Sequence, residues 1–265
     1  MTARFLEHVL PGAGDKVFAF STTRHGGCGS GAYATLNCTP YVGDDPATVE
    51  RNLDLLLGSF PQRPRQLLMP QQTHGIGLAH VDEAFLALSP DMRHGLLQGI
   101  DALVTGVPGV CVAVSTADCI PVLLADVTHG AVAAVHAGWR GTLAGVVPHT
   151  LQAMTRLYGT RPAEDLAACI GPGISAAAFE VGQEVADLFA GAGFPMADIA
   201  YTDASTGKPH IDLPAANRLQ LLGSGLSPER ICISGLCTYT RCDDFFSARR
   251  LGIKSGRMLS GIMWR

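Results

Sequence analysis

Hydrophobic and polar positions along the chain follow two patterns, which predict both strands and helices. Short apolar runs, bounded by Gly, Pro or polar residues, are typical of buried strands. Hydrophobic residues that recur three and four positions apart are typical of helices with one buried face. The apolar runs predict strands at 16–21, 109–115, 122–126, 131–136, 167–170 and 230–234. The helical spacing predicts helices at 46–57, 143–158, 181–189 and 213–222.

The order of these elements indicates a mixed α/β (α+β) fold. Strands and helices interleave without the regular repetition of a doubly wound parallel sheet, and several strands resemble hairpin partners. We therefore expect a single domain over residues 1–265, built as a sandwich of mixed sheets flanked by helices. The sequence contains no internal repeat and no obvious linker, and 191–209 is its most loop-like internal stretch.

A predicted hairpin in the middle of the chain brings a cysteine close to a histidine. Its two apolar runs, 120–127 and 131–135, are joined by the short turn Thr128-His129-Gly130. The start of the first strand then lies beside the end of the second, so Cys119 and His136 can meet in space. Polar and bulky residues around both positions interrupt the apolar pattern, which favours a functional cleft over a simple core position.

A second histidine of interest lies in a polar loop upstream. His74 follows Gln71-Gln72-Thr73 and precedes Gly75. His, Cys and His side chains suit zinc, and three protein ligands with an open fourth position describe a catalytic zinc site. Positions 74, 119 and 136 match no compact metal motif, so their spacing alone does not decide between a zinc site and ordinary core residues.

The composition is typical of an ordinary cytoplasmic enzyme. Of the 265 residues, 47% are hydrophobic and 16% charged, enough for a sizeable core. The net charge of −4 gives no general attraction to nucleic acid or to anionic membranes. Residues 1–20 lack the apolar core of a secretory signal, no apolar run is long enough to span a bilayer, and the eight scattered cysteines suit a reducing compartment. We therefore expect a cytoplasmic enzyme without a nucleic-acid, membrane or obligate protein partner.

A series of short segments, taken in order, is similar to the laccase-domain family. This family is also called YfiH/YlmD-type purine nucleoside phosphorylase, polyphenol oxidase or peptidoglycan editing factor. The resemblance runs from about Phe18 to Trp264. The segments are TRHGG (23–27), LN (36–37), QQTHG (71–75), DALVT (101–105), TADCIP (116–121), HAGWRG (136–141), IGPGI (170–174), FEV (179–181), HIDL (210–213), CT (237–238) and FFSARR (245–250).

The resemblance implies a zinc enzyme that acts on purine nucleosides. It implies that His74, Cys119 and His136 are the metal ligands, with copper as the alternative metal. It also implies phosphorolysis of adenosine, inosine and methylthioadenosine, with adenosine deamination as a second activity. Purine nucleoside and phosphate are then the partners of the chain. The family often has an aromatic residue where this chain has Ala248, so contacts made by that side chain do not transfer.

Further residues are expected to bind the substrate or to assist catalysis. Guanidinium groups match phosphate oxygens, so the candidates for a phosphate clamp are Arg24, Arg140 and Arg249, with Arg140 also assigned to catalysis. Asp118 is expected to orient a histidine ring or to transfer a proton, and its alternative role is to cap a turn. Phe246, or its neighbour Phe245, is the candidate for contact with the purine ring. The resemblance also implies that Ser247 and Asn37 bind ribose or base.

Other mechanisms remain open at this point. In a cysteine hydrolase, Cys119 is a thiolate nucleophile and His136 its base, and such an enzyme could edit peptidoglycan precursors. A copper-dependent polyphenol oxidase is a weaker alternative, because one His-Cys-His site lacks the several copper centres that four-electron oxygen reduction requires. A non-catalytic binding module with a closed metal site is the fourth interpretation.

Overall fold

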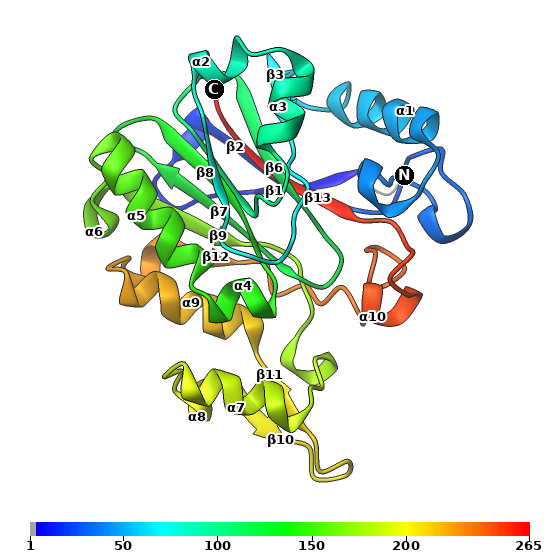
Figure 1. Ribbon diagram of the computed structural model, residues 1–265, viewed down its shortest axis with the longest axis vertical. Helices are drawn as coiled ribbons and strands as arrows, with labels where there is room; N and C mark the ends of the chain where they lie inside the picture. The colour runs from blue at the N-terminus through cyan, green and yellow to red at the C-terminus, as the bar shows by residue number, and fades with distance from the viewer. Residues whose placement is uncertain (1–3) are drawn as a thin grey trace.

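A computed structural model describes residues 4–265, which form a mixed α/β structure of sheets and helices. Figure 1 shows the arrangement of the elements. The strands are β1 (Phe5–His8), β2 (Val17–Thr22), β3 (Gln66–Leu68), β4 (Leu78–Val81), β5 (Ala102–Thr105), β6 (Val110–Thr116), β7 (Ile120–Asp126), β8 (Ala131–Ala137), β9 (Leu166–Ile170), β10 (Ala200–Thr202), β11 (Pro209–Ile211), β12 (Ile231–Ile233) and β13 (Met258–Trp264). The helices are α1 (Pro46–Leu57), α2 (Glu83–Leu86), α3 (Pro90–Leu96), α4 (Trp139–Leu143), α5 (Val146–Tyr158), α6 (Pro162–Asp165), α7 (Gln183–Gly191), α8 (Met196–Ile199), α9 (Leu213–Gly223) and α10 (Ala248–Leu251).

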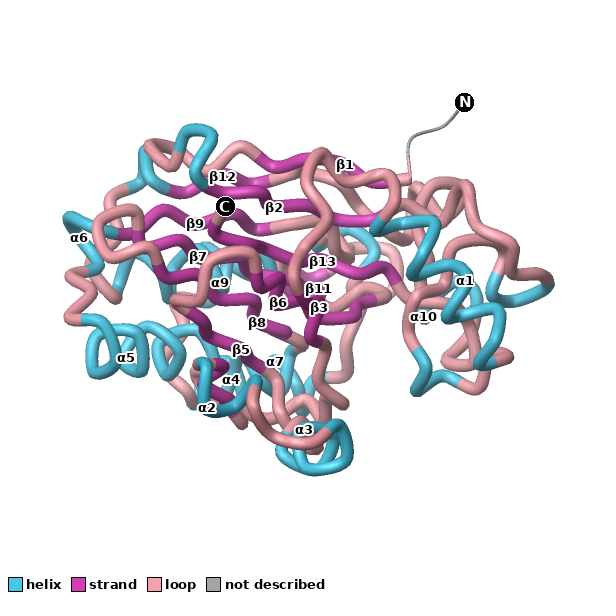
Figure 2. Tube along the Cα trace, turned by 90° about the horizontal axis from the view of Figure 1, so that it is seen from above, coloured by secondary structure: helices cyan, strands magenta, loops and turns pink. Residues whose placement is uncertain are grey.

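Two sheets pack face to face and form the centre of the molecule. The five-stranded sheet has the order β1-β2-β13-β6-β3, and the six-stranded sheet has the order β12-β9-β7-β8-β5-β4. Both sheets mix parallel and antiparallel pairs, and Figure 2 shows their strands crossing the middle of the molecule. A separate hairpin of β10 and β11 lies with α7 and α8 at the lower end of the view in Figure 1. The prediction of a mixed α/β sandwich is confirmed.

Alternating side chains of the central strands bury both faces of each sheet. In β8, Val132 and Ala134 belong to the core between the two sheets, whereas Ala133 and Val135 belong to the core beneath α5 and α9. The same alternation in β6 directs Val114 into the core between the sheets. Side chains of a strand alternate with a period of two, so His136 in β8 and Thr116 in β6 face the inter-sheet space at its end.

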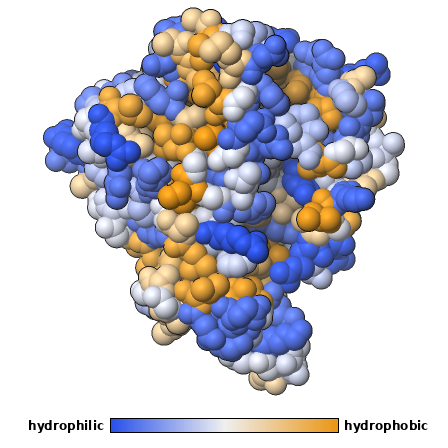
Figure 3. Space-filling model, viewed as in Figure 1, coloured by the Kyte–Doolittle hydropathy of each residue, from blue (hydrophilic) through white to orange (hydrophobic). Residues whose placement is uncertain are grey.

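The helices cover the outer faces of the two sheets. Helices α5 and α9 pack on the six-stranded sheet, with Val147, Leu151 and Leu221 in the shared core. Helix α1 packs on the five-stranded sheet through Leu56, against a cluster that includes Phe18, Phe20 and Phe60. On the face shown in Figure 3, hydrophobic residues form several separate areas rather than one continuous surface. Within residues 4–265, no helix has the length and apolar character needed to cross a membrane.

The predicted elements are present, with two differences in detail. The helix predicted at 143–158 is two helices, α4 and α5, because Gly145 between them has a left-handed backbone with φ of 78°. The loop-like stretch 191–209 contains α8 and β10, and β10 pairs with β11. Seven strands of the described residues were not predicted: β1, β3, β4, β5, β10, β11 and β13.

Strand ends of both sheets meet at one edge, which organises the site described below. Ile120 at the start of β7 pairs with Ala137 at the end of β8, and Ala102 at the start of β5 pairs with Val135. In the other sheet, Met258 at the start of β13 pairs with Thr116 at the end of β6. The loops that leave these ends therefore gather side chains from distant parts of the sequence.

Candidate metal centre and its cavity

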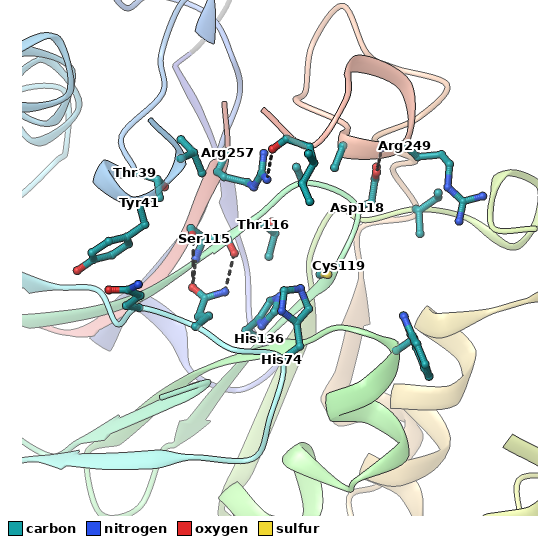
Figure 4. A pocket seen from close by; sticks show the side chains of 18 of the residues that line it. Thr39, Tyr41, His74, Ser115, Thr116, Asp118, Cys119, His136, Arg249 and Arg257 are labelled. Carbon is teal, nitrogen blue, oxygen red and sulfur yellow. Dashed lines mark hydrogen bonds between the residues drawn. The ribbon is translucent and has the colours of Figure 1, made fainter. Parts of the chain in front are cut away.

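The three candidate ligands lie together at this edge. His74, Cys119 and His136 each offer one ligand atom, and these atoms all lie within 4.8 Å of one another. His74 lies in the loop between β3 and β4, Cys119 immediately precedes β7, and His136 is in β8. Figure 4 shows the two histidine rings below Cys119, in one cavity. The predicted hairpin thus brings Cys119 and His136 together, and a third loop adds His74.

A buried carboxylate holds the loop that carries His74. The Asp101 side chain is fully buried and accepts backbone N–H bonds from Thr73, His74 and Gly75, at 3.3, 3.0 and 2.8 Å. His74 itself has a left-handed backbone, with φ of 63°, which a side chain other than glycine rarely adopts without support. The three hydrogen bonds to Asp101 supply this support and fix the direction of the His74 side chain.

The same carboxylate orients the ring of His136. Asp101 Oδ1 lies 2.8 Å from His136 Nδ1, and the backbone carbonyl of Asp101 accepts from the His136 N–H at 2.8 Å. Nδ1 is therefore engaged, and Nε2 is the ring nitrogen free to bind a metal. Burial alone would raise the pKa of Asp101, but His136 and the N–H groups of Gly75 and Thr73 outweigh burial and hold that pKa below its usual range.

Electrostatic coupling between the candidate ligands favours an ionised thiol. Burial alone would raise the pKa of Cys119, but the charges and hydrogen bonds of His136 and His74 lower it to about 6. Burial alone would lower the pKa of His136, but Cys119 and Asp101 raise it to about 9. Cys119 is thus poised as a thiolate, the form in which cysteine binds metal or acts as a nucleophile.

The space between the ligands fits a small ion. Gly138 adjoins all three side chains: a Cβ at this position would lie 3.0 Å from Cys119 Sγ, 3.1 Å from His74 Cδ2 and 3.7 Å from His136 Cε1. A glycine at this position therefore leaves the space between the three candidate ligands open. Two imidazole nitrogens and one thiolate sulfur form a donor set that suits zinc. The residues present therefore fit a zinc ion, which His74, Cys119 and His136 would hold beside the cavity that they line.

The described residues contain one other group with metal-ligand side chains. Asp126, His129 and Asp165 lie near one another, but the Asp165 carboxylate accepts hydrogen bonds from Arg161 and Thr128. Asp126 likewise accepts from His129 and from backbone N–H groups. Hydrogen bonds thus satisfy both carboxylates, and this group joins the turn of the β7–β8 hairpin to the end of α6.

A cavity of about 760 Å³ opens over the candidate ligands. This volume is in the range of sites that enclose small organic molecules, roughly 300–1,000 Å³. Apolar walls come from Trp139, Ile174 and Phe179, and polar groups come mostly from the strand ends. The full lining is Thr39, Tyr41, Val42, Gln71, Gln72, His74, Ser115, Thr116, Ala117, Asp118, Cys119, His136, Trp139, Ile174, Phe179, Ala248, Arg249, Ile253 and Arg257.

Asp118 lines the cavity, but its carboxylate accepts hydrogen bonds from groups other than a histidine ring. Oδ1 accepts from the Thr238 hydroxyl at 2.7 Å, and Oδ2 accepts from the backbone N–H of Arg249 at 2.7 Å. These contacts tie the turn before Cys119 to the start of α10. The contact with the His136 ring that was expected of Asp118 is made by Asp101.

The three arginines of the expected phosphate clamp are not gathered in one place. Only Arg249 lines the cavity, and its guanidinium donates to the Glu180 carbonyl at 3.0 Å. Arg24 donates to the carbonyls of Ala34 and Cys242, and its guanidinium lies over the Phe246 ring. Arg140 is exposed, and its guanidinium lies 4.2 Å from the centre of the Trp139 ring. The expected clamp therefore reduces to Arg249 at the cavity wall.

The other expected substrate contacts are buried beside the cavity rather than in its lining. The Asn37 side chain bonds the backbone of Thr39, the carboxylate of Asp44 and the backbone N–H of Arg257. Phe246 and Phe245 are fully buried core residues. Ser247 is also buried, and its hydroxyl caps α10 by accepting the Arg250 N–H. In this geometry these side chains support the cavity wall.

Asp101 and Arg257 contribute to the site but were not among the residues expected from the sequence. Asp101 was noted only as part of a family-like segment, although an acidic residue directly before a buried strand could have indicated a role at the strand end. Arg257 lines the cavity next to β13, a strand that was itself not predicted. With that strand unrecognised, no sequence signal located Arg257 beside Cys119.

The chain is similar to several known proteins. Residues 18–265 match the family described as "Multi-copper polyphenol oxidoreductase laccase". The chain is 52% identical to a purine nucleoside phosphorylase of Bacteroides thetaiotaomicron, over 92% of this chain and 90% of that protein. It is 43% identical to adenosine deaminase RL5 of an unknown prokaryotic organism, over 93% of each chain.

A solved structure has the same fold. YlmD from Geobacillus stearothermophilus superimposes with a TM-score of 0.86 at 30% sequence identity, and the match covers 100% of both chains. The match to the family covers residues 18–265, nearly the whole sequence. The two relatives are named as enzymes that act on nucleosides. The chain therefore belongs to the laccase-domain family of YfiH/YlmD-type proteins.

Proposed function

We propose that the protein is a zinc-dependent purine nucleoside enzyme. Its main reaction is the phosphorolysis of adenosine, inosine and methylthioadenosine, and adenosine deamination is its second activity. The observation that carries this proposal is the cluster of His74, Cys119 and His136, with ligand atoms within 4.8 Å of one another beneath a cavity of about 760 Å³. The relatives named purine nucleoside phosphorylase and adenosine deaminase support the choice of substrate.

The residues of this chain divide the work of binding and positioning. His74, Cys119 and His136 would hold the ion, and zinc bound there supplies Lewis acidity close to the substrate. Asp101 holds the His136 ring and the His74 loop in place before substrate arrives. Trp139 and Phe179 provide apolar wall for a purine, and the strand ends of both sheets contribute to one cavity. We accordingly infer that the chain forms one catalytic domain.

Phosphorolysis requires that an oxyanion and a sugar carbon are held in line. A phosphate oxygen forms a bond to C1′ while the C1′–N bond to the base breaks, and the electron pair of that bond goes to the purine. Positive charge builds on the sugar and negative charge on the base, which takes up a proton. Catalysis therefore depends on positioning of the phosphate and on stabilisation of the departing purine.

The test combines metal content with product analysis. The purified protein is assayed with adenosine in the presence and absence of phosphate, and adenine, inosine and ribose 1-phosphate are measured. About one zinc per chain, with adenine and ribose 1-phosphate formed only when phosphate is present, is the expected result. Adenine release that does not depend on phosphate, or the absence of any purine product, contradicts the proposal.

The ligand assignment has a test of its own. Cys119→Ala and His136→Ala should each lose bound zinc while keeping a cooperative unfolding transition. A matched control is Cys28→Ala, since Cys28 is exposed and lies outside the cavity lining. A full metal complement in either ligand variant contradicts the assignment.

One geometric observation favours a second candidate, a cysteine hydrolase. Cys119, His136 and Asp101 form a chain of nucleophile, base and orienting carboxylate, and the pKa of Cys119 is lowered to about 6. Such a site would suit the editing of peptidoglycan precursors. Full activity on these precursors after complete zinc removal, with no activity in Cys119→Ser, would favour the hydrolase, because zinc would occupy the same thiolate in the nucleoside enzyme.

A further inference from the structure

We propose that Arg257 and Thr116 form a subsite for a tetrahedral oxyanion, inorganic phosphate, in the wall of the cavity beside the candidate metal ligands. The subsite rests on the proposed function for its role, because phosphate would be the attacking group there. It replaces the clamp expected from Arg24 and Arg140, which do not line the cavity. Figure 4 shows Arg257 and Thr116 on the side of the cavity above Cys119.

Thr116 offers a hydroxyl that has no partner. Thr116 is the last residue of β6 and is only 2% exposed, and it lines the cavity. Within residues 4–265, its Oγ1 has no hydrogen-bond partner. A buried polar group without a partner costs about 1–3 kcal/mol. A ligand oxygen bound in the cavity would accept from this hydroxyl and remove that cost.

Arg257 brings a positive charge to the same strand end. Met258 pairs with Thr116 across β13 and β6, so Arg257 lies directly beside the end of β6. Its guanidinium donates to the backbone carbonyls of Ser255, Gly256 and Ile253 at 2.7, 3.0 and 2.9 Å. In the described part of the chain, it forms no ion pair with a carboxylate. These carbonyl groups thus hold the guanidinium group in place, and its positive charge remains available to an anion.

The described acidic groups near Arg257 attract it without forming an ion pair. Cys119 and Asp118 favour the charged guanidinium electrostatically, and both oxygens of Asp118 accept hydrogen bonds from Thr238 and from the Arg249 backbone. Cys119 is committed to the two histidines. Burial lowers the pKa of Arg257, and an anionic ligand would compensate this cost of desolvation. Guanidinium groups bind tetrahedral oxyanions through two parallel N–H bonds.

A fixed scaffold positions this arginine in advance of binding. The side-chain oxygen of Asn37 accepts the backbone N–H of Arg257 at 3.1 Å, and the Asn37 amide donates to Asp44 at 2.9 Å. The buried Asn52 in turn donates to the Asn37 carbonyl at 2.9 Å. Asn37, expected from the sequence to contact substrate, is therefore a positioning residue for Arg257. Such preorganisation reduces the entropy lost when phosphate binds.

The test compares phosphate-dependent and phosphate-independent reactions of the same enzyme. Thr116→Val removes only the unpartnered hydroxyl and keeps the shape of the side chain, so the variant should fold at least as well as the wild type. Arg257→Gln removes the positive charge. Arg257→Lys keeps a positive charge but lacks the parallel N–H donors of a guanidinium group. We expect the KM for phosphate to rise about 10–100-fold in Arg257→Gln and about 3–10-fold in Thr116→Val, while adenosine deamination changes less than about threefold.

A control separates the subsite from general charge effects. Arg63 is exposed and paired with Asp54 on α1, so Arg63→Gln removes one positive charge without touching the cavity. Its KM for phosphate should equal that of the wild type. An unchanged KM for phosphate in both Thr116→Val and Arg257→Lys overturns the subsite. Equal losses of phosphorolysis and deamination in these variants also overturn it, because they indicate a structural role.

Direct binding keeps the failure of the subsite distinct from the failure of the proposed function. Inorganic phosphate is titrated calorimetrically into the zinc-loaded protein without nucleoside. Binding to the wild type that weakens in Thr116→Val and Arg257→Lys supports the subsite even if no phosphorolysis is found, and only the proposed function then fails. Phosphate binding of equal strength in wild type and variants, or no binding to the wild type, overturns the subsite even if phosphorolysis is confirmed.

Discussion

The buried carboxylate of Asp101 connects two of the three candidate metal ligands. Its Oδ1 lies 2.8 Å from His136 Nδ1 and accepts the backbone N–H of His74 at 3.0 Å. One side chain thus sets both the ring orientation of His136 and the strained backbone of the His74 loop. Cys119 comes from a different turn, so the geometry of the centre depends on how the two sheets bring these elements together.

This relationship predicts that Asp101→Asn weakens metal binding. An Asn amide would direct its NH₂ group at backbone N–H groups that now donate to the carboxylate, and the loop would shift. We expect zinc affinity to fall about 10–100-fold, as for other residues that orient metal ligands. Competition with a chromogenic chelator measures this. Asp118→Asn is the matched comparison, and a larger loss of affinity there than in Asp101→Asn would contradict the role given to Asp101.

Gly138 provides a second test of the metal centre. In Gly138→Ala, the new Cβ would lie 3.0 Å from Cys119 Sγ and 3.1 Å from His74 Cδ2. The backbone at Gly138, with φ of −68° and ψ of 168°, accepts alanine without strain, so the fold should persist. We expect less than half of the wild-type zinc content, measured by atomic emission, with an unchanged circular dichroism spectrum.

The matched control for this variant lies in a helix. Gly223 in α9 has open space where a Cβ would be added, so Gly223→Ala should keep its zinc and gain about 0.5–1 kcal/mol of stability. Full zinc content in Gly138→Ala would show that zinc does not bind in the space between His74, Cys119 and His136.

The sequence pattern predicted the strands and helices that are strongly apolar or strongly periodic. Helix α1 has the bounds expected for it, and the strands of the β7–β8 hairpin are close to theirs. Strand β13 was missed because Ser260 and Gly261 interrupt its apolar run, although it lies in the middle of the five-stranded sheet. Its stability comes from pairing with β2 and β6, which are distant in sequence, and local propensity does not record such contacts.

The candidate site could be predicted in its ligands but less well in its surroundings. The hairpin pattern was enough to bring Cys119 near His136, whereas His74 required the family resemblance. Arginines were chosen by charge and by motif, and charge does not reveal which guanidinium already has partners. Arg24 and Arg140 interact with carbonyls and rings outside the cavity. Arg257 reaches the cavity only through the register of β13 with β6.

Arg24 should therefore contribute to stability rather than to phosphate binding. Its guanidinium donates to Ala34 and Cys242 and lies 4.9 Å from the centre of the Phe246 ring, which joins the N-terminal loop to the C-terminal segment. We expect Arg24→Gln to lower the free energy of unfolding by about 1–3 kcal/mol in urea titrations. The KM for phosphate should stay within about twofold. A tenfold rise in the KM for phosphate, with unchanged stability, would show that Arg24 binds phosphate after all.

The pH dependence of stability should contain a contribution from His8. His8 Nε2 lies 2.8 Å from the Ser21 hydroxyl, and burial lowers the pKa of His8 to about 4, against about 6.5 in an unfolded chain. Between these values the unfolded state binds more protons, so this contribution is fully present above about pH 6.5 and is lost as the pH falls through about 4. Because the ring is partly exposed, we expect a loss of only about 1–2 kcal/mol from this residue.

In His8→Gln, which keeps a hydrogen-bonding side chain but does not titrate, the free energy of unfolding should fall less between pH 7 and 4, as measured by urea unfolding at several pH values. All other groups titrate alike in the two proteins, so parallel profiles would show that His8 is not the group responsible.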